Sequence, residues 1–264
     1  MSGGEDLRGL LEQRGLTTVA GVFALEGGQD LSKAGLGHRR RTRVVLPDHG
    51  GVAFYVKRYG REPLLVALRR WFTYGLRGSP ASVEAANIEA ARSAGLTQME
   101  VLASGQEGPP HRPVRSFLVV REIDGQSLER CGPQLARRLG EAGVSELLTE
   151  RLAELVARLH GAGYVHRDLY ACHIFVERGL EGGTLSLIDL ARMFRPRWRA
   201  FRWQVKDLAQ LRSSMDVAWV QQCWEPFLRG YLRTRGEGAF GRYNRAVVAK
   251  CRRIAAGRLR KGSA

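Results

Sequence analysis

The sequence has few cysteines, and none of them lies at a spacing that binds zinc or forms a CxxC redox pair. The four cysteines, Cys131, Cys172, Cys223 and Cys251, are scattered between residues 131 and 251. Scattered cysteines are typical of reducing compartments, where thiols stay free. The sequence therefore predicts free thiols rather than a scaffold built on disulfides.

Long hydrophobic runs are also missing, because no stretch of about 18 apolar residues could cross a bilayer. Residues 1–16 carry Glu5, Asp6 and Glu12 and lack the apolar core of a signal peptide. We therefore expect a cytoplasmic protein whose contact with a membrane, if it has one, is peripheral.

Acidic residues are scarce, since 26 Asp and Glu stand against 42 Lys and Arg and leave a formal charge of +16. Such an excess attracts polyanions, namely nucleic acid, anionic lipid headgroups or phosphorylated glycans. Hydrophobic residues make up 44% of the 264 residues, which is enough for a packed core. This length fits one bilobal domain or two small ones.

The first 120 residues are expected to be mainly strands and loops, with one helix. Apolar and β-branched stretches predict strands at Val19–Leu25, Thr42–Leu46, Gly50–Tyr59 and Ser116–Val120. Good helix formers predict a helix at Pro80–Ala94, which Gly95 would end.

The second half has a helical pattern. Leu148, Leu152, Leu155 and Leu159 recur at spacings of four, three and four, which places them on one face of a helix. Two short strands are predicted next, at 174–176 and 185–190, and the remainder is helical and basic. The sequence predicts an α+β fold of two lobes, residues 1–120 and 121–264, with a hinge at 121–124.

A His-Arg-Asp tripeptide, His166-Arg167-Asp168, lies between the leucine-striped helix and the next strand. Protein kinases carry this tripeptide in that helix–loop–strand setting, where the Asp accepts a hydrogen bond from the attacking hydroxyl and aims it at the γ-phosphorus of ATP. We therefore predict that Asp168, with His166 and Arg167, forms a catalytic loop. The alternative is a chance tripeptide on a surface loop.

Asp189 lies at the end of the predicted strand, directly after Leu185-Ser186-Leu187-Ile188 and twenty-one residues after Asp168. Kinases place there the carboxylate that holds Mg²⁺ across the ATP phosphates. The tripeptide here is Asp-Leu-Ala and departs from Asp-Phe-Gly, so a turn-capping Asp is the alternative. His173 occupies the position of a second metal ligand, five residues after Asp168. It is either a ligand of the metal or a His that hydrogen-bonds within the loop.

Lys57, in Phe54-Tyr55-Val56-Lys57, resembles the kinase lysine that reaches the α- and β-phosphates of ATP, and a Lys facing solvent is the alternative. Its expected partner on the following helix is Glu84, with Glu89 as the second choice. We predict that adenine binds along the backbone of Arg121–Ile123. Two glycine turns before strands, Gly27-Gly28 and Gly35-Leu36-Gly37, are weaker candidates for a phosphate loop.

Taken together, these residues resemble the lipopolysaccharide kinase family, over roughly residues 20 to 215. The segment HRDLYACHIFV at 166–176 carries the resemblance, because this family has Cys-His before the strand where most kinases keep Asn. IDLAR at 188–192 and KDLA at 206–209 add to it. The resemblance implies a protein-kinase-like fold, use of ATP and Mg²⁺, and phosphorylation of heptose or Kdo in the inner core. It also implies that Asp207 braces the catalytic loop, and that the enzyme works at the inner face of the inner membrane.

The segment between Asp189 and Asp207 is rich in arginine and aromatic residues. Guanidinium groups suit phosphates and the Kdo carboxylate, and flat rings suit sugar faces. We therefore predict an acceptor site there, although a solvated loop and a site for single-stranded nucleic acid are alternatives. The predicted acceptor residues are Arg192, Arg195, Arg197 and Arg199, with Arg202, Phe194, Trp198, Phe201 and Trp203 interleaved.

Two further functions and one surface stay open from the sequence. A small-molecule or protein kinase shares the fold, and a non-catalytic pseudokinase that binds nucleic acid fits the charge, although Lys57, Asp168 and Asp189 argue against the second. The basic stretch Arg242–Lys261 is predicted to lie on anionic membrane. Alternatively, it packs its apolar stripe, Tyr243, Val247, Cys251 and Ile254, on the core.

Overall fold

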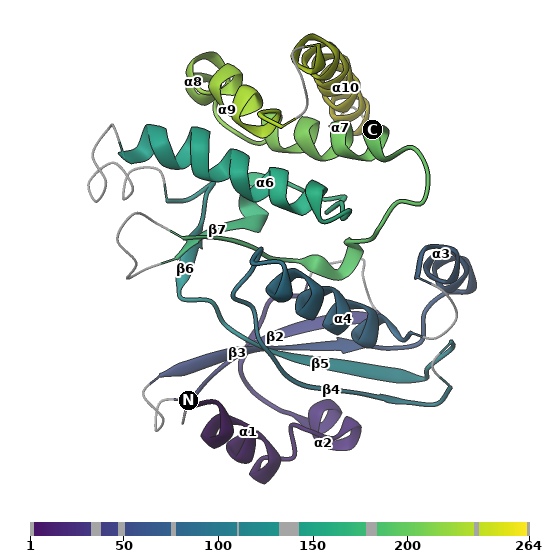
Figure 1. Ribbon diagram of the computed structural model, residues 1–264. Coiled ribbons are helices and arrows are strands. Elements are labelled where there is room, and N and C mark those ends of the chain that lie inside the picture. Colours follow the sequence, from purple (N-terminus) through teal and green to yellow (C-terminus); the bar gives the residue numbers. More distant parts are fainter. Residues whose placement is uncertain are drawn as a thin grey trace. The chain divides into compact units, whose positions relative to one another are not determined.

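The computed structural model describes residues 3–32, 38–46, 51–74, 78–109, 111–131, 143–177, 184–234 and 238–262 (Figure 1). The chain divides into two compact units, and each is treated by itself. Unit 1 comprises Met1–Arg92 and Gln98–Ile123, and unit 2 comprises Ser93–Thr97 and Asp124–Ala264. Unit 1 contains a five-stranded sheet and unit 2 is mainly helical, which confirms the predicted α+β fold.

Unit 1 is built on an antiparallel sheet with the strand order β1-β2-β3-β5-β4. Its strands are β1 (Gln29–Asp30), β2 (Arg39–Leu46), β3 (Val52–Tyr59), β4 (Val101–Glu107) and β5 (Arg115–Arg121). Alternate side chains of a strand point to opposite faces. Phe54 and Val56 of β3 therefore join the apolar core on one face, while Lys57 and Tyr59 reach a helix on the other.

Both faces of this sheet are covered by helices, as Figure 1 shows. The helices of unit 1 are α1 (Gly3–Gln13), α2 (Val19–Ala24), α3 (Leu64–Tyr74) and α4 (Pro80–Ser93). Leu7 and Leu11 of α1 and Val22 of α2 pack with Phe54 and Phe117 of the sheet in one buried cluster. Helix α4 lies on the opposite face and carries Glu84 toward β3.

The predicted strand at Val19–Leu25 is wrong, because the segment forms helix α2. Thr18 caps the helix, since its hydroxyl oxygen accepts a hydrogen bond from the Gly21 amide at 3.1 Å. A Cβ at Gly21 would lie 2.1 Å from the carbonyl oxygen of Gly15, so only glycine allows this close turn. Helices α1 and α3 were also not predicted, whereas β2, β3, β5 and α4 were, within a few residues.

Unit 2 combines a small antiparallel sheet with helices. The sheet has the order β6 (Gly125–Ser127), β7 (Ile174–Glu177) and β8 (Leu185–Leu187). The helical elements are η2 (Leu147–Arg151), α6 (Leu152–Gly161), η3 (Ala171–His173), η4 (Leu190–Arg192), α7 (Ala200–Arg212), α8 (Val217–Gln222), α9 (Trp224–Tyr231) and α10 (Ala239–Gly262). The leucine stripe is a helix, as predicted, and Leu152, Leu155 and Leu159 are buried.

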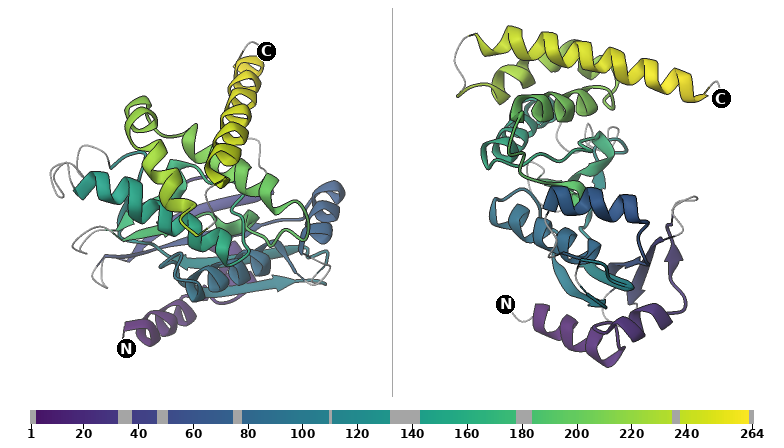
Figure 2. Two further views of the ribbon diagram at one scale, coloured as in Figure 1. Left: turned by 45° about the horizontal axis from the view of Figure 1, so that its top comes forward. Right: turned by 90° about the vertical axis from the view of Figure 1, so that its right-hand side faces the viewer.

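Helix α10 packs its apolar stripe against α7 (Figure 2). Val247 is fully buried, and the hydroxyl of Tyr243 donates to Oε1 of Gln204 at 2.7 Å. The thiol of Cys251 lies 3.5 Å from the carbonyl oxygen of Ala209. The stripe is therefore part of the core of unit 2, and the alternative interpretation of the basic C-terminal stretch is the one that the structure supports.

Within the described ranges, no helix has the length and apolar character needed to span a membrane. All four cysteines lie in these ranges, and none of them forms a disulfide bond there.

Candidate active site

The predicted catalytic loop of unit 2 is braced by one buried carboxylate. Asp207, on α7, accepts hydrogen bonds from two successive backbone amides, that of His166 at 2.7 Å and that of Arg167 at 2.8 Å. Asp207 is completely buried. Arg167 has a φ of 71°, a left-handed conformation that costs energy for a residue with a side chain. The two hydrogen bonds therefore hold a strained backbone in place directly before Asp168.

Asp168 is engaged by an arginine. Nη1 of Arg192 lies 2.9 Å from Oδ1 and 2.8 Å from Oδ2 of Asp168. The Asp168 side chain is 20% exposed and the Arg192 side chain 50%, so the pair lies at the surface of the unit with the carboxylate the more sheltered partner. This contact holds the carboxylate in one orientation.

Lys206 is a second cation beside Asp168. Its ammonium group donates a hydrogen bond to the carbonyl oxygen of Arg167, the residue before Asp168. Burial lowers the pKa of Lys206, and the charge of the Asp168 carboxylate opposes that shift. The loop thus presents one carboxylate with two cationic side chains, Arg192 and Lys206, around it.

His166 is an internal support of the loop. Its ring is fully buried, and Nε2 lies 2.9 Å from the carbonyl oxygen of Ile188. Burial lowers the pKa of His166, because an imidazolium cation loses its hydration there. The neutral ring donates from Nε2 and ties the catalytic loop to the segment that leads to Asp189.

His173 and Asp189 come together in unit 2. Nδ1 of His173 donates to the carbonyl oxygen of Asp168 at 2.7 Å, so the hydrogen bond within the loop, one of the two expected roles, is present. Nε2 of the same ring lies 3.6 Å from Oδ2 of Asp189. Asp189 has a φ of 58° and is half exposed, which presents its carboxylate outward from the turn after β8.

These two side chains fit a magnesium ion that takes most of its ligands elsewhere. Because Nδ1 of His173 contacts the Asp168 carbonyl, Nε2 is the ring nitrogen that faces the Asp189 carboxylate, and an imidazole nitrogen and a carboxylate oxygen are both metal-ligating groups. Mg²⁺ binds through one or two carboxylates together with waters and phosphate oxygens. Within the described part of the chain, no three His, Cys, Asp or Glu side chains form a metal-binding group. Asp189 and His173 alone would leave most ligand positions of a Mg²⁺ ion to waters and phosphate oxygens.

The four arginines of the predicted acceptor segment have different surroundings. Arg192 is bound to Asp168, Arg195 stacks over the ring of Tyr164 at 4.3 Å, and Arg199 precedes α7 with a φ of 58°. Arg197 is exposed. Trp198 is 81% exposed, so an aromatic face is available among these cations.

In unit 1, Lys57 pairs with Glu84, as predicted. The ammonium group of Lys57 donates to Oε1 of Glu84, and the hydroxyl of Tyr59 donates to Oε2. The Glu84 side chain is 1% exposed, so this charge is shielded from solvent and has two partners. Glu89, the second choice, is 66% exposed and lies near Arg92.

The stretch Arg121–Ile123 ends β5 at the border of unit 1 and contains an ion pair that the sequence did not reveal. Glu122 accepts two hydrogen bonds from Arg43, at 2.7 and 2.6 Å, and one from the hydroxyl of Tyr55 at 2.6 Å. The Arg43 guanidinium holds the pKa of Glu122 below its ordinary value. These hydrogen bonds anchor Glu122, the middle residue of the stretch Arg121–Ile123 whose backbone is predicted to bind adenine.

The glycine turns are described in part. Gly27 and Gly28 have φ values of 85° and 84° and lead into β1. A Cβ at Gly28 would lie 2.8 Å from the carbonyl oxygen of Arg43, so this turn requires glycine for its contact with β2. The second turn, at 35–37, lies outside the described residues.

Sequence reasoning gave no role to Lys206 and did not find His160. His160 is buried, with Nδ1 2.8 Å from the hydroxyl oxygen of Tyr231 and Nε2 3.4 Å from Oδ2 of Asp207. His160 therefore contacts Asp207, the carboxylate that holds the predicted catalytic loop. A buried His on an apolar helix face gives no signal that separates this role from ordinary packing, but Lys206 adjoins Asp207 in the KDLA motif and could have been noted.

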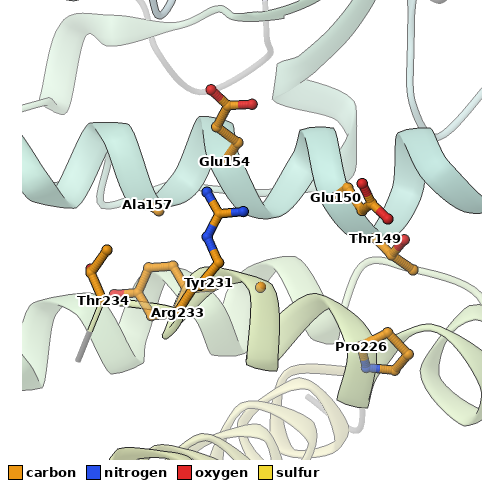
Figure 3. A pocket seen from close by; sticks show the side chains of 9 residues that line it. Thr149, Glu150, Glu154, Ala157, Pro226, Tyr231, Arg233 and Thr234 are labelled. Atoms are coloured by element: carbon orange, nitrogen blue, oxygen red, sulfur yellow. The ribbon is translucent and has the colours of Figure 1, made fainter. Parts of the chain in front are cut away.

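A cavity of about 470 Å³ also lies in unit 2, among η2, α6 and α9 (Figure 3). Its charged lining residues are Glu150, Glu154 and Arg233, and Figure 3 shows Arg233 reaching from the end of α9 toward α6. None of its lining residues belongs to the catalytic loop or to the predicted acceptor segment. The cavity is therefore separate from the residues around Asp168.

Comparison with known proteins places these residues in a family. Residues 35–231 match the model of the "Lipopolysaccharide kinase (Kdo/WaaP) family". The lipopolysaccharide core heptose(I) kinase WaaP of Pseudomonas aeruginosa is 31% identical over 152 residues, which are 55% of this chain and 57% of the relative. The enzyme of the same name from Escherichia coli is 29% identical over 178 residues, 65% of this chain and 62% of the relative.

A solved structure of WaaP in complex with acyl carrier protein is also similar, with a TM-score of 0.66 and 27% identity. The likeness covers 90% of this chain and 91% of the solved chain. It confirms the predicted protein-kinase-like fold. The sequence matches, in contrast, span about three fifths of the length of the curated relatives.

Proposed function

This chain belongs to the lipopolysaccharide kinase (Kdo/WaaP) family, and we propose that it transfers the γ-phosphate of ATP to a hydroxyl of heptose or Kdo in the lipopolysaccharide inner core. The family match and the names of the curated relatives support the proposal. The proposal follows the two predicted lobes, with nucleotide binding in residues 1–120 and at the hinge that follows them, and catalysis and acceptor binding in residues 121–264.

The observation that carries the proposal is the braced loop around Asp168. Asp207 holds the strained backbone before Asp168 through two amides, and Arg192 orients the Asp168 carboxylate. An aspartate with a purely structural role would not need all three features of this loop, namely a partly exposed carboxylate at Asp168, a strained backbone at Arg167 and a buried second carboxylate at Asp207. This preorganisation suits a carboxylate that positions a reacting group.

In the proposed reaction, Asp168 accepts a hydrogen bond from the acceptor hydroxyl and aims its oxygen at the γ-phosphorus. The hydroxyl proton passes to Asp168 as the new bond to phosphorus forms, and ADP leaves. Arg192 keeps the carboxylate in position, and Lys206 fixes the carbonyl before it. His166 and Arg167 contribute through the shape of the loop.

ATP and Mg²⁺ are the proposed cofactors. Lys57, held by Glu84, is proposed to bind the α- and β-phosphates, and the backbone of Arg121–Ile123 to bind adenine. Asp189 and His173 are the proposed ligands of Mg²⁺, which would neutralise the charge of the β- and γ-phosphates.

The acceptor is proposed to bind at the arginines around Trp198. The exposed Trp198 offers a flat face to a sugar ring, and Arg195, Arg197 and Arg199 offer charge to a phosphate or a carboxylate. An anionic core sugar fits this chemistry better than a neutral one.

We propose a cytoplasmic enzyme that works peripherally at the inner face of the inner membrane, where a lipid-linked acceptor would be found. The anionic membrane surface is its proposed partner, since the chain carries a formal charge of +16. The similar solved structure holds acyl carrier protein, so a carrier protein is a second partner to test.

The experiment is an acceptor screen with Mg²⁺ and ATP. ADP release is measured without an acceptor and with dephosphorylated core oligosaccharide, a small-molecule acceptor and a general protein substrate. Release that rises with the oligosaccharide alone supports the proposal. A rise with the small molecule or protein favours another kinase function, and binding of nucleic acid without any ADP release favours the pseudokinase.

A further inference from the structure

Helix α3 of unit 1 has an apolar face that the described residues of its own unit leave uncovered. Its exposed fractions are 55% for Leu64, 75% for Leu65, 39% for Leu68 and 91% for Phe72. At about 100° per residue, these four side chains fall within an arc of about 100° on one side of the helix. A cluster of large apolar side chains at such exposure marks an interaction surface.

The opposite face of α3 is firmly attached to unit 1. Ala67 and Arg70 are buried, and Nε of Arg70 lies 2.9 Å from Oε2 of Glu62 in a sheltered ion pair. Arg70 and Trp71 both donate to the carbonyl oxygen of His111, at 3.1 and 2.7 Å. Polar contacts to the β4–β5 connection therefore hold the helix, and its leucines and Phe72 are left for another purpose.

The charges around the apolar face have one sign. Arg61 and Arg69 are exposed beside it, whereas Glu62, the acidic residue of this stretch, is buried in its pair with Arg70. Residues 60–74, all described, therefore expose cations and no carboxylate. An apolar face with a cationic border fits a surface that is apolar below an anionic layer.

We propose that the outer face of α3 docks this chain on an anionic lipid bilayer, with Leu65 and Phe72 entering the boundary between headgroups and acyl chains. The inference rests on the proposed function for one point, that the acceptor is linked to lipid. Helix α10 does not serve as the apolar contact, because its stripe packs on α7. Figure 1 shows α3 near the end of the unit 1 sheet where β4 and β5 connect, which agrees with its contacts to His111.

The test is flotation of the full chain with vesicles of phosphatidylglycerol and phosphatidylcholine, or of phosphatidylcholine alone, at low and high salt. The variant Leu65→Ser/Phe72→Ser removes the two most exposed apolar side chains of the helix. Val217→Ser, at the start of α8 in unit 2, is the matched control, because Val217 is an apolar side chain that is 72% exposed. Thermal unfolding of each variant shows that it is folded.

The chain and the Val217→Ser control should float with anionic vesicles at low salt. The fraction of the double variant that floats with them should be lower by about tenfold or more. Equal flotation of the double variant would overturn the proposal. A finding that the wild type is a dimer and the double variant a monomer would also overturn it, because a second copy of the chain would then occupy the face. A variant that keeps flotation but loses a carrier protein in a binding assay would also overturn it.

The readout separates this inference from the proposed function. Turnover of a water-soluble core oligosaccharide should be the same in the double variant and the wild type, because α3 carries none of the proposed catalytic residues. A chain that floats through α3 but phosphorylates no sugar would refute the proposed reaction alone. A chain that phosphorylates the sugar but does not float would refute the docking face alone.

Discussion

Nη1 of Arg192 donates to both carboxylate oxygens of Asp168, at 2.9 and 2.8 Å, across 24 residues of sequence. Arg192, which was predicted to bind the acceptor, thus contacts Asp168, which was predicted to orient the acceptor hydroxyl. An exposed ion pair contributes little to stability. We therefore interpret this contact as one that positions Asp168 for the reaction.

Arg192→Ala should lower kcat about 10- to 100-fold, because the Asp168 carboxylate would lose its fixed orientation. The KM for ATP should change less than about twofold, since the change does not touch the nucleotide site. The kcat of Arg192→Lys should lie between those of Arg192→Ala and wild type. Arg229→Ala breaks a surface pair with Glu225, at 2.7 Å, and should leave kcat unchanged. A rise of kcat in Arg192→Ala would show that the pair restrains the enzyme instead.

Glu84→Gln should raise the KM for ATP about tenfold, because Lys57 would lose its charged partner and its position. Glu89→Gln on the same helix is the control, since Glu89 is 66% exposed, and it should behave as wild type. Initial rates at varied ATP give both values. Equal KM values in the two variants would remove the Lys57–Glu84 pair from nucleotide binding.

His173→Ala should raise the Mg²⁺ concentration needed for half-maximal rate several-fold, whereas His173→Asn should retain most activity because an amide oxygen also binds Mg²⁺. His111→Ala, in unit 1, controls for the loss of an imidazole. The measurement is the initial rate of each variant at saturating ATP over a range of Mg²⁺ concentrations. An unchanged Mg²⁺ dependence of His173→Ala would leave His173 with its hydrogen bond to the Asp168 carbonyl and no metal role.

His166 should make the stability of the protein depend on pH. Burial lowers its pKa from an ordinary value of 6.5, although Asp207 and Asp189 oppose the shift. Below about pH 6.5 the unfolded chain therefore binds a proton that the folded chain does not. The free energy of unfolding should fall as pH drops through this region, by at most about 1.4 kcal/mol per pH unit from this group.

The check on His166 is urea denaturation of wild type and His166→Gln between about pH 5 and 8, the range around an ordinary His pKa. Gln keeps a side-chain donor for the Ile188 carbonyl and does not titrate. The variant should be less stable at neutral pH and should have a flatter pH profile than wild type. Parallel profiles would show that His166 is not the titrating group.

Local signals account for what the sequence predicted well. The His166–Asp168 tripeptide, Asp189 after its strand and Asp207 in KDLA are short patterns, and each lies on the type of element that the pattern implies. The resemblance to kinases predicted the pairing of Lys57 with Glu84, but it did not reveal helix α3, which lies between β3 and α4 in the sequence.

The sequence failed where distant or competing interactions decide. Val19–Leu25 has the composition of a strand, but the Thr18 cap and packing on the sheet make it a helix. The Arg192–Asp168 pair depends on how two turns come together, which spacing does not reveal. The apolar stripe of α10 looked equally fit for lipid or for core, and the packing of Val247 on α7 selected the core.

The central claim is that Asp168 positions a sugar hydroxyl for transfer from ATP, and phosphorylation of dephosphorylated core oligosaccharide tests it most directly. Wild type and Asp168→Asn are compared by mass spectrometry of the sugar, with binding of an ATP analogue measured alongside. The account predicts a phosphorylated sugar with wild type, and turnover about 100-fold or more lower in Asp168→Asn with nucleotide binding retained. Turnover of Asp168→Asn within a few-fold of wild type would contradict it.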